Sequence, residues 1–139
     1  MITYEWRGPF TSAEVGLLHA EAFGDPAGTG GTGGPGGARD WRAQVERHSL
    51  GWVCARDDSD LAGFVNVAWD GGVHAFILDT VVSAARRREG IGTRLVAVAA
   101  GEARRAGCAW LHVDFEEHLR SFYIRGCGFT PSSAGLIAL

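Results

Sequence analysis

A run of arginines followed by two glycines stands just ahead of a helical pattern, an arrangement that could bind an anion. Residues 84–92 read AARRREGIG. The segment before them, VHAFILDTVV at 73–82, is rich in β-branched and aromatic residues and predicts a strand. After them, Ile91, Leu95 and Val98 recur at helical spacing. The order is therefore strand, glycine-containing turn, helix.

This order of elements suits a phosphate group. Glycine lets the backbone approach a ligand closely, and the first N–H groups of a helix have no partner within the helix. The helix dipole adds a preference for negative charge, and arginines can pair with phosphate oxygens. The sequence therefore predicts a site for a pyrophosphate-sized anion, held mainly by the main chain. The same residues also fit a plain strand-to-helix turn with a basic surface.

Polar side chains collect on one face of the next predicted strand, AWLHVDFEE at 109–117. The alternation directs one set of residues to the core and the other set away from it. The core set is Leu111, Val113 and Phe115, and the polar set is His112, Asp114 and Glu116. A short amphipathic helix with Phe122 and Tyr123 on one face is predicted after this strand, closed by Gly126 and Gly128.

His112, Asp114 and Glu116, with His74 or His118 added, are types of residue that can bind a metal ion. Ligands at alternate positions of one strand lie too far apart to close on a single ion, and the chain has no H-E-x-x-H motif or cysteine pair. We therefore expect no metal.

A second glycine cluster, GDPAGTGGTGGPGGARD at 24–40, matches G-x-G-x-x-G at Gly28, Gly30 and Gly33. That fingerprint needs a strand before it, whereas TSAEVGLLHAEAF at 11–23 predicts a helix capped by Thr11 or Ser12. Another helix is predicted after the cluster, capped by Asp40. Residues 24–38 are therefore interpreted as a flexible surface loop, a linker in preference to a lid over a binding site.

The whole chain limits the possible functions. Its 139 residues fit a single domain, and its net charge of -3 predicts no nucleic-acid or membrane partner. All 13 basic residues are arginine, so a P-loop lysine and a Schiff-base lysine are excluded. There is no membrane-length apolar run and no signal pattern, and the three cysteines form no C-x-x-C pair. We expect a cytoplasmic protein with free thiols.

Two motifs together resemble the GCN5-related N-acetyltransferase (GNAT) family. RREGIG at 87–92 is similar to the family's R/Q-x-x-G-x-G/A motif, and FYIRGCGF at 122–129 is similar to its second signature. One helix and one strand separate them, as in the family. The resemblance covers residues 61–130, and the first sixty residues agree in their general order of elements.

The resemblance implies an α/β fold in which helices flank a mixed, mostly antiparallel sheet of six or seven strands. It also implies acetyl-CoA as co-substrate, with its pyrophosphate on main-chain amides of the glycine turn. The strand before the turn should splay from its neighbour, and the N–H of Val82 should reach the thioester carbonyl there. The binding residues carried over are Val82, Arg87, Arg88, Glu89, Gly90, Ile91, Gly92 and Thr93.

The same resemblance gives Tyr123 the role of the acid that protonates the departing thiolate. The alternative is a tyrosine packed in the core. The family does not fix the base that deprotonates the amine. Glu116 and Asp114 are our candidates, with Asp79 as a third, and each could instead be a structural carboxylate. Many members have asparagine where this chain has Glu116.

The sequence therefore predicts an enzyme that transfers an acetyl group from acetyl-CoA to a primary amine by direct attack, without a role for cysteine. The acidic groups favour a cationic small-molecule amine, while a peptide amine stays open. Both a monomer and a homodimer are compatible with the sequence. The alternative function is a module of the same fold that binds acyl-CoA without catalysis.

Overall fold

The computed structural model describes residues 1–23 and 39–139. The predicted loop at 24–38, with its G-x-G-x-x-G match, lies outside the described residues. Two 3₁₀ turns, η1 (Ala84–Arg86) and η2 (Glu117–Leu119), and one π-helix, η3 (Ser121–Gly126), are present in the described residues in addition to the α-helices. The elements in chain order are β1 (Ile2–Trp6), α1 (Ser12–Phe23), α2 (Trp41–His48), β2 (Ser49–Asp57), β3 (Asp60–Trp69), β4 (His74–Val82), η1 (Ala84–Arg86), α3 (Ile91–Arg105), β5 (Trp110–Val113), η2 (Glu117–Leu119) and η3 (Ser121–Gly126).

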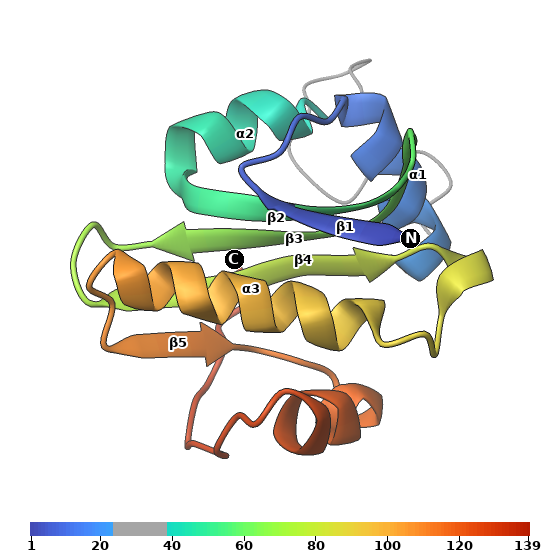
Figure 1. Cartoon of the computed structure of the whole chain (residues 1–139). Coiled ribbons are helices and arrows are strands. Elements are labelled where there is room, and N and C mark those ends of the chain that lie inside the picture. Colours follow the sequence, from blue (N-terminus) through green and yellow to red (C-terminus); the bar gives the residue numbers. More distant parts are fainter. Residues whose placement is uncertain (24–38) are drawn as a thin grey trace.

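The sheet has the order β1-β2-β3-β4-β5 (Figure 1). Its first four strands are antiparallel neighbours, and β5 runs parallel to β4. The expected mixed, mostly antiparallel sheet flanked by helices is confirmed. The expected strand count was wrong, because the described residues form five strands where we expected six or seven. The final residues form no strand, and their sequence TPSSAGLIAL contains Pro131 and Gly135, which disfavour one.

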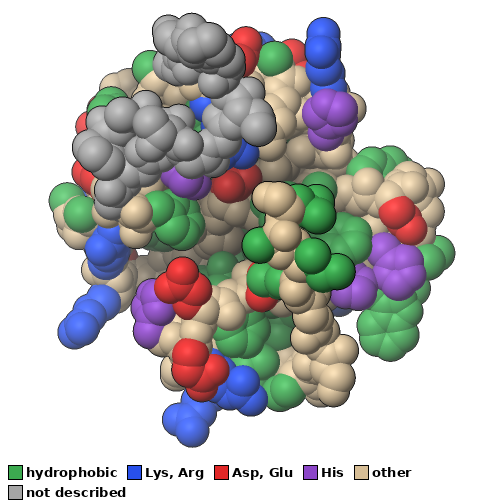
Figure 2. Space-filling model, turned by 180° about the vertical axis from the view of Figure 1, so that it is seen from behind, with side chains coloured by type: hydrophobic (Ala, Val, Ile, Leu, Met, Phe, Trp, Pro, Cys, Tyr) green, Lys and Arg blue, Asp and Glu red, His purple; other side chains and the backbone are tan. Residues whose placement is uncertain are grey.

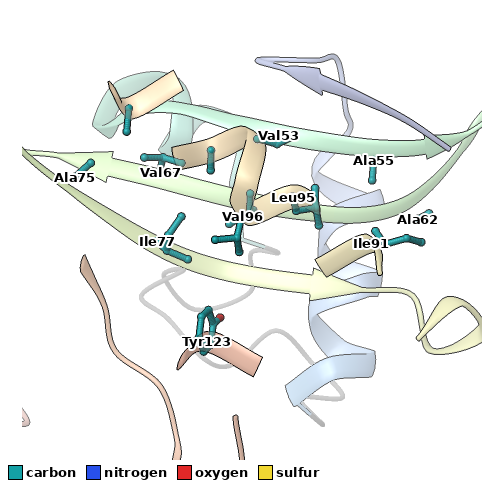
Figure 3. Packing of buried hydrophobic residues seen from close by; sticks show 13 residues of the cluster. Val53, Ala55, Ala62, Val67, Ala75, Ile77, Ile91, Leu95, Val96 and Tyr123 are labelled. Atoms are coloured by element: carbon teal, nitrogen blue, oxygen red, sulfur yellow. The ribbon is translucent and has the colours of Figure 1, made fainter. Parts of the chain in front are cut away.

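Helices cover both faces of the sheet. Figure 1 shows α3 crossing one face, with α1 and α2 on the other. A buried cluster joins α3 to the sheet through Leu95, Val96 and Ile77, and Tyr123 of η3 belongs to the same cluster (Figure 3). A second buried cluster joins α1 and α2 to the opposite face. Burial on both faces explains why the middle of β2 and of β3 is apolar at nearly every position.

The predicted caps form as expected at the two helices before β2. Thr11 Oγ1 accepts from the Glu14 N–H at 3.2 Å, and Glu14 returns a bond to the Thr11 N–H at 2.9 Å. This reciprocal pair is a capping box. Asp40 accepts from the Ala43 N–H at 3.0 Å and also binds the Ser12 hydroxyl, so it caps α2 and ties it to the start of α1.

Gly51 in β2 lies against the ring of Trp6, and a Cβ at this position would be 2.2 Å from Trp6 Cζ2. Gly51→Ala should therefore lower the free energy of unfolding by about 2 kcal/mol or more, because the indole has to leave its position. Gly101→Ala in α3 is the matched control, since a methyl group there meets open space. It should raise the stability by about 0.5–1 kcal/mol. Urea unfolding of both variants measures the difference, and equal midpoints would contradict the packing argument.

The sheet opens where β5 stops. Pairing between β4 and β5 runs from His74↔Trp110 to Ile77↔Val113, while β4 continues to Val82. After Val113 the chain turns away from β4 (Figure 1). Among the described residues, the last residues of β4 therefore have a sheet neighbour on the β3 side and none on the β5 side.

No helix in the described part of the chain is both long and apolar enough to cross a membrane.

Candidate active site

The predicted anion site lies at the start of α3, which begins at Ile91 as the sequence indicates. Gly90 is the N-cap residue, with a left-handed φ of 82°, and its carbonyl accepts from the Arg94 N–H at 3.1 Å. No side chain of residues 1–23 or 39–139 caps this helix. Within the described residues, the N–H groups of residues 90–93 donate no hydrogen bond. These donors and the helix dipole remain available to an anion.

Two of the three arginines before the turn are available to a ligand. Arg86 forms ion pairs with Asp57 and with Glu89. Arg87 and Arg88 are exposed, and neither forms an ion pair with any described residue. Arg88 has a positive φ of 68°, an uncommon conformation for a residue other than glycine. The run thus divides into one arginine that anchors the turn to β2 and two exposed guanidinium groups beside it.

The two glycines of the motif are required for different reasons. A Cβ on Gly90 would meet nothing within 4 Å, so this position needs glycine for its left-handed backbone. A Cβ on Gly92 would be 3.0 Å from Phe122 Cζ, so this position needs glycine to let Phe122 pack. Phe122 belongs to the second sequence motif. The contact therefore joins the two motifs directly, which the spacing in the sequence could not show.

Val82 lies at the open end of β4. The next N–H, from Ser83, donates to the Ala62 carbonyl on the β3 side at 2.8 Å. Successive N–H groups of a strand point to opposite edges, so the Val82 N–H points toward the side that β5 has left. This direction fits the expected role of Val82 as a donor to a carbonyl oxygen held in the opening.

Tyr123 is nearly buried, with 6% of its surface exposed. Its ring stacks on Phe115 and meets Phe122 and Phe129 edge-on. It lies in the π-helix η3, where the sequence predicted an ordinary short helix, and π-helical turns are frequent at functional sites. Burial raises the pKa of the Tyr123 hydroxyl, and the neighbouring Thr80 hydroxyl acts weakly in the opposite direction. Tyr123 therefore keeps its proton at neutral pH.

The alternation of residues 110–116 is confirmed, although the strand is shorter than predicted. Leu111, Val113 and Phe115 pack against the cluster under α3, while Asp114 and Glu116 are exposed. Both carboxylates lie beyond the end of β5, and Glu116 is 82% exposed, with Oε2 3.4 Å from Nδ1 of His118. The backbone thus carries them to the open side of the sheet without burying them.

A third carboxylate lies deeper. Asp79 interrupts β4 at a bulge, where the pairing with β3 jumps from Asn66↔Leu78 to Phe64↔Val81. Its φ is 55°, and its Oδ1 lies 3.7 Å from Nε2 of His19 on α1. Figure 2 shows acidic and histidine side chains around a hollow on the α1 and α2 side of the molecule. No motif in the sequence points to His19.

A model of the acetyltransferase (GNAT) family matches residues 14–129 of the sequence. The chain belongs to the GNAT family. A GNAT family acetyltransferase from Streptococcus pneumoniae TIGR4 is similar in structure, with a TM-score of 0.75 and 22% identity over 100% of this chain and 98% of that one. No curated protein sequence matches the chain significantly.

Two further GNAT-like structures carry informative names. Glucosamine-6-phosphate N-acetyltransferase from Arabidopsis thaliana aligns with a TM-score of 0.71 and 15% identity, over 99% of this chain and 98% of that one. The enzyme AAC(6')-Iy, in complex with the bisubstrate analogue CoA-S-monomethyl-acetylneamine, aligns with a TM-score of 0.72 and 16% identity. The alignment covers 100% of this chain and 97% of that one. At these identities the likeness establishes the GNAT fold.

Two cysteines of this GNAT protein, Cys54 and Cys127, are poorly suited to nucleophilic chemistry. Burial raises the pKa of Cys54 to about 12 and the pKa of Cys127 to about 11. A thiol is nucleophilic as the thiolate, so both are inert at neutral pH. Within the described residues, no group of three or more His, Cys, Asp or Glu side chains is arranged to hold a metal ion.

Proposed function

We propose that the chain, as one domain, transfers an acetyl group from acetyl-CoA to a primary amine by direct attack. The observation that carries the proposal is the placement of the unpaired N–H groups at the start of α3 next to the open end of β4. The exposed Arg87 and Arg88 border the same turn. Main-chain donors there suit a pyrophosphate, and the opening beside Val82 suits a thioester.

Each residue then has a defined task. The N–H groups from Arg88 to Thr93 hold the pyrophosphate, and the Val82 N–H stabilises the carbonyl oxygen as it gains negative charge. Tyr123 donates its proton to sulfur as the carbon–sulfur bond breaks. The acceptor nitrogen loses a second proton after its attack, and that proton returns to the Tyr123 oxygen. A phenol suits this transfer because its pKa is close to that of a thiol.

The acceptor is proposed to be a cationic small-molecule amine. Asp114, Glu116 and Asp79 place negative charge on the open side of the sheet, which attracts an ammonium group. Two structural neighbours are named for amine chemistry, one on glucosamine 6-phosphate and one bound to an acetylneamine analogue of CoA. Peptide amines are the second class to be tested.

The test is turnover with acetyl-CoA. Purified protein is incubated with acetyl-CoA and spermidine, neamine, glucosamine 6-phosphate or a lysine peptide, and release of free thiol is measured together with the mass of the product. We expect thiol release and a 1:1 acetylated product with at least one cationic amine. Calorimetry with CoA is run in parallel. Binding without release across the panel would favour the non-catalytic acyl-CoA module, and absence of binding would overturn both.

A further inference from the structure

Asp79 occupies a backbone conformation that costs energy in a strand. Its positive φ places it in the left-handed region, which is unfavourable for a residue with a Cβ. Such strain persists where the surrounding structure holds it, and it is concentrated at functional sites. Here two residues of β4, Asp79 and Thr80, stand opposite one residue of β3, Val65.

The bulge directs two neighbouring side chains to opposite faces of β4. The Asp79 carboxylate meets His19 of α1 on one face. The Thr80 hydroxyl lies beside Tyr123, which packs in the cluster on the α3 face. The oxygen of Thr80 is buried and makes no hydrogen bond of ordinary geometry with a described residue. A carboxylate and a phenol thus approach the open end of β4 from its two sides.

His19 is held firmly in its position beside Asp79. Its ring lies between Phe23, with centroids 4.4 Å apart, and Trp41, at 4.8 Å. The last turn of α1 is also tied to the end of β4, because Glu21 Oε2 accepts from the Ala84 N–H at 3.0 Å. The side chains of His19 and Asp79 are 19% and 17% exposed, so both reach solvent while packed.

From this geometry we propose that Asp79 accepts the proton of the acceptor ammonium and that His19 is the positioning residue that holds the Asp79 carboxylate at the opening. This rests on the proposed function and names the group that performs its first step. One N–H bond of the ammonium breaks, its electron pair stays on nitrogen, and the proton forms an O–H bond on the Asp79 carboxylate. The nitrogen lone pair is then free to attack.

Partial burial separates Asp79 from the other two candidates. Asp114 and Glu116 lie on exposed chain beyond β5, where water screens their charge. The side chain of Asp79 packs against α1, and Asp79 is adjacent in sequence to the residue that contacts Tyr123. Asp114 and Glu116 on this account attract the cation without taking its proton.

The decisive variant is Asp79→Asn, because asparagine tolerates a positive φ and preserves the bulge. With the fastest amine of the panel at pH 7, kcat/KM should fall about 100-fold or more, with CoA affinity unchanged. The deficit should shrink above about pH 10, where a primary amine has lost its proton unaided. His19→Asn should lower kcat about tenfold and also change the shape of the pH profile. His48→Asn, at the exposed last residue of α2, and Glu117→Gln, at the exposed first residue of η2, are the controls.

Three results would overturn the proposal. The first is a wild-type kcat/KM in Asp79→Asn. The second is a loss of kcat/KM in that variant that is the same at every pH. The third is a larger loss of kcat/KM in Asp114→Asn or Glu116→Gln than in Asp79→Asn. Should Asp79→Asn fail to fold, Asp79→Glu and His19→Gln replace it in the same assay.

A readout without substrate separates this proposal from the proposed function. In ¹H–¹⁵N spectra, the titration of the His19 ring should move to lower pH in Asp79→Asn, because a favourable charge 3.7 Å away is lost. The signals of the exposed His48 ring serve as the internal control and should be the same in both proteins. If the His19 titration shifts but no amine of the panel is acetylated, the proposed acetyl transfer is contradicted and the pairing of His19 with Asp79 still holds. An unchanged His19 titration would overturn the pairing itself.

Discussion

Replacement of Tyr123 by Phe is expected to lower kcat about 100-fold or more while leaving the affinity for CoA unchanged. The substitution removes the hydroxyl proton donor and keeps the ring, which supplies the contacts to Phe115, Phe122 and Phe129. Because burial raises the pKa of this hydroxyl, the wild-type acid stays protonated throughout the neutral range, and its loss should be visible throughout that range. Stopped-flow detection of free thiol measures the rate, and calorimetry measures the CoA affinity.

The chain contains a matched control for this experiment. Its other tyrosine, Tyr4, also packs against the cluster under α3, and burial raises its pKa too. Tyr4 lies on β1, at the opposite edge of the sheet from β5. Tyr4→Phe should retain the wild-type rate. If Tyr123→Phe also retained it, the acid role would be refuted, and a combined loss of rate and of thermal stability would assign Tyr123 to packing.

Gly90→Val is the second substitution with a large expected effect, at least about a 30-fold loss of CoA affinity. A β-branched residue at a φ of 82° is a genuine outlier, so the turn has to change its conformation. The N–H groups of residues 90–93 then no longer converge on one anion. Isothermal titration with CoA, at low and at moderate salt, measures the loss.

Gly107→Val provides the comparison at the other end of the same helix. Gly107 has a φ of 91° and equally open surroundings. Both variants should therefore lose a similar amount of stability, roughly 1–2 kcal/mol, whereas Gly107→Val should bind CoA as the wild type does. Equal affinities in the two variants would mean that the pyrophosphate does not depend on the start of α3.

Local sequence signals explain why the starts of α1, α2 and α3 were predicted correctly. Gly90 and Gly107 both adopt positive φ and bracket α3, and Asp40 and Thr11 form the expected caps. These signals act over three or four residues and are readable in the sequence. The anion site at the start of α3 was predictable for the same reason, since it is built from consecutive residues.

Features that depend on distant segments were less predictable. Nothing in the sequence marks Val113 as the last residue of β5, because the strand ends where its partner β4 bends at the Asp79 bulge. The pairing of His19 with Asp79 likewise depends on how α1 docks. One signal was available, since His19 follows Val15 and Leu18 at positions i, i+3 and i+4 and therefore lies on the face that α1 buries.

The exposed guanidinium groups beside the turn have a practical consequence. Every cationic side chain of the protein is an arginine or a histidine, and none carries a primary amine. A guanidinium group keeps its proton under all ordinary conditions, so it is a poor nucleophile toward a thioester. When a lysine peptide is offered as substrate, any acetyl-lysine found by mass spectrometry must come from the peptide, since this protein has no lysine on which self-modification could occur.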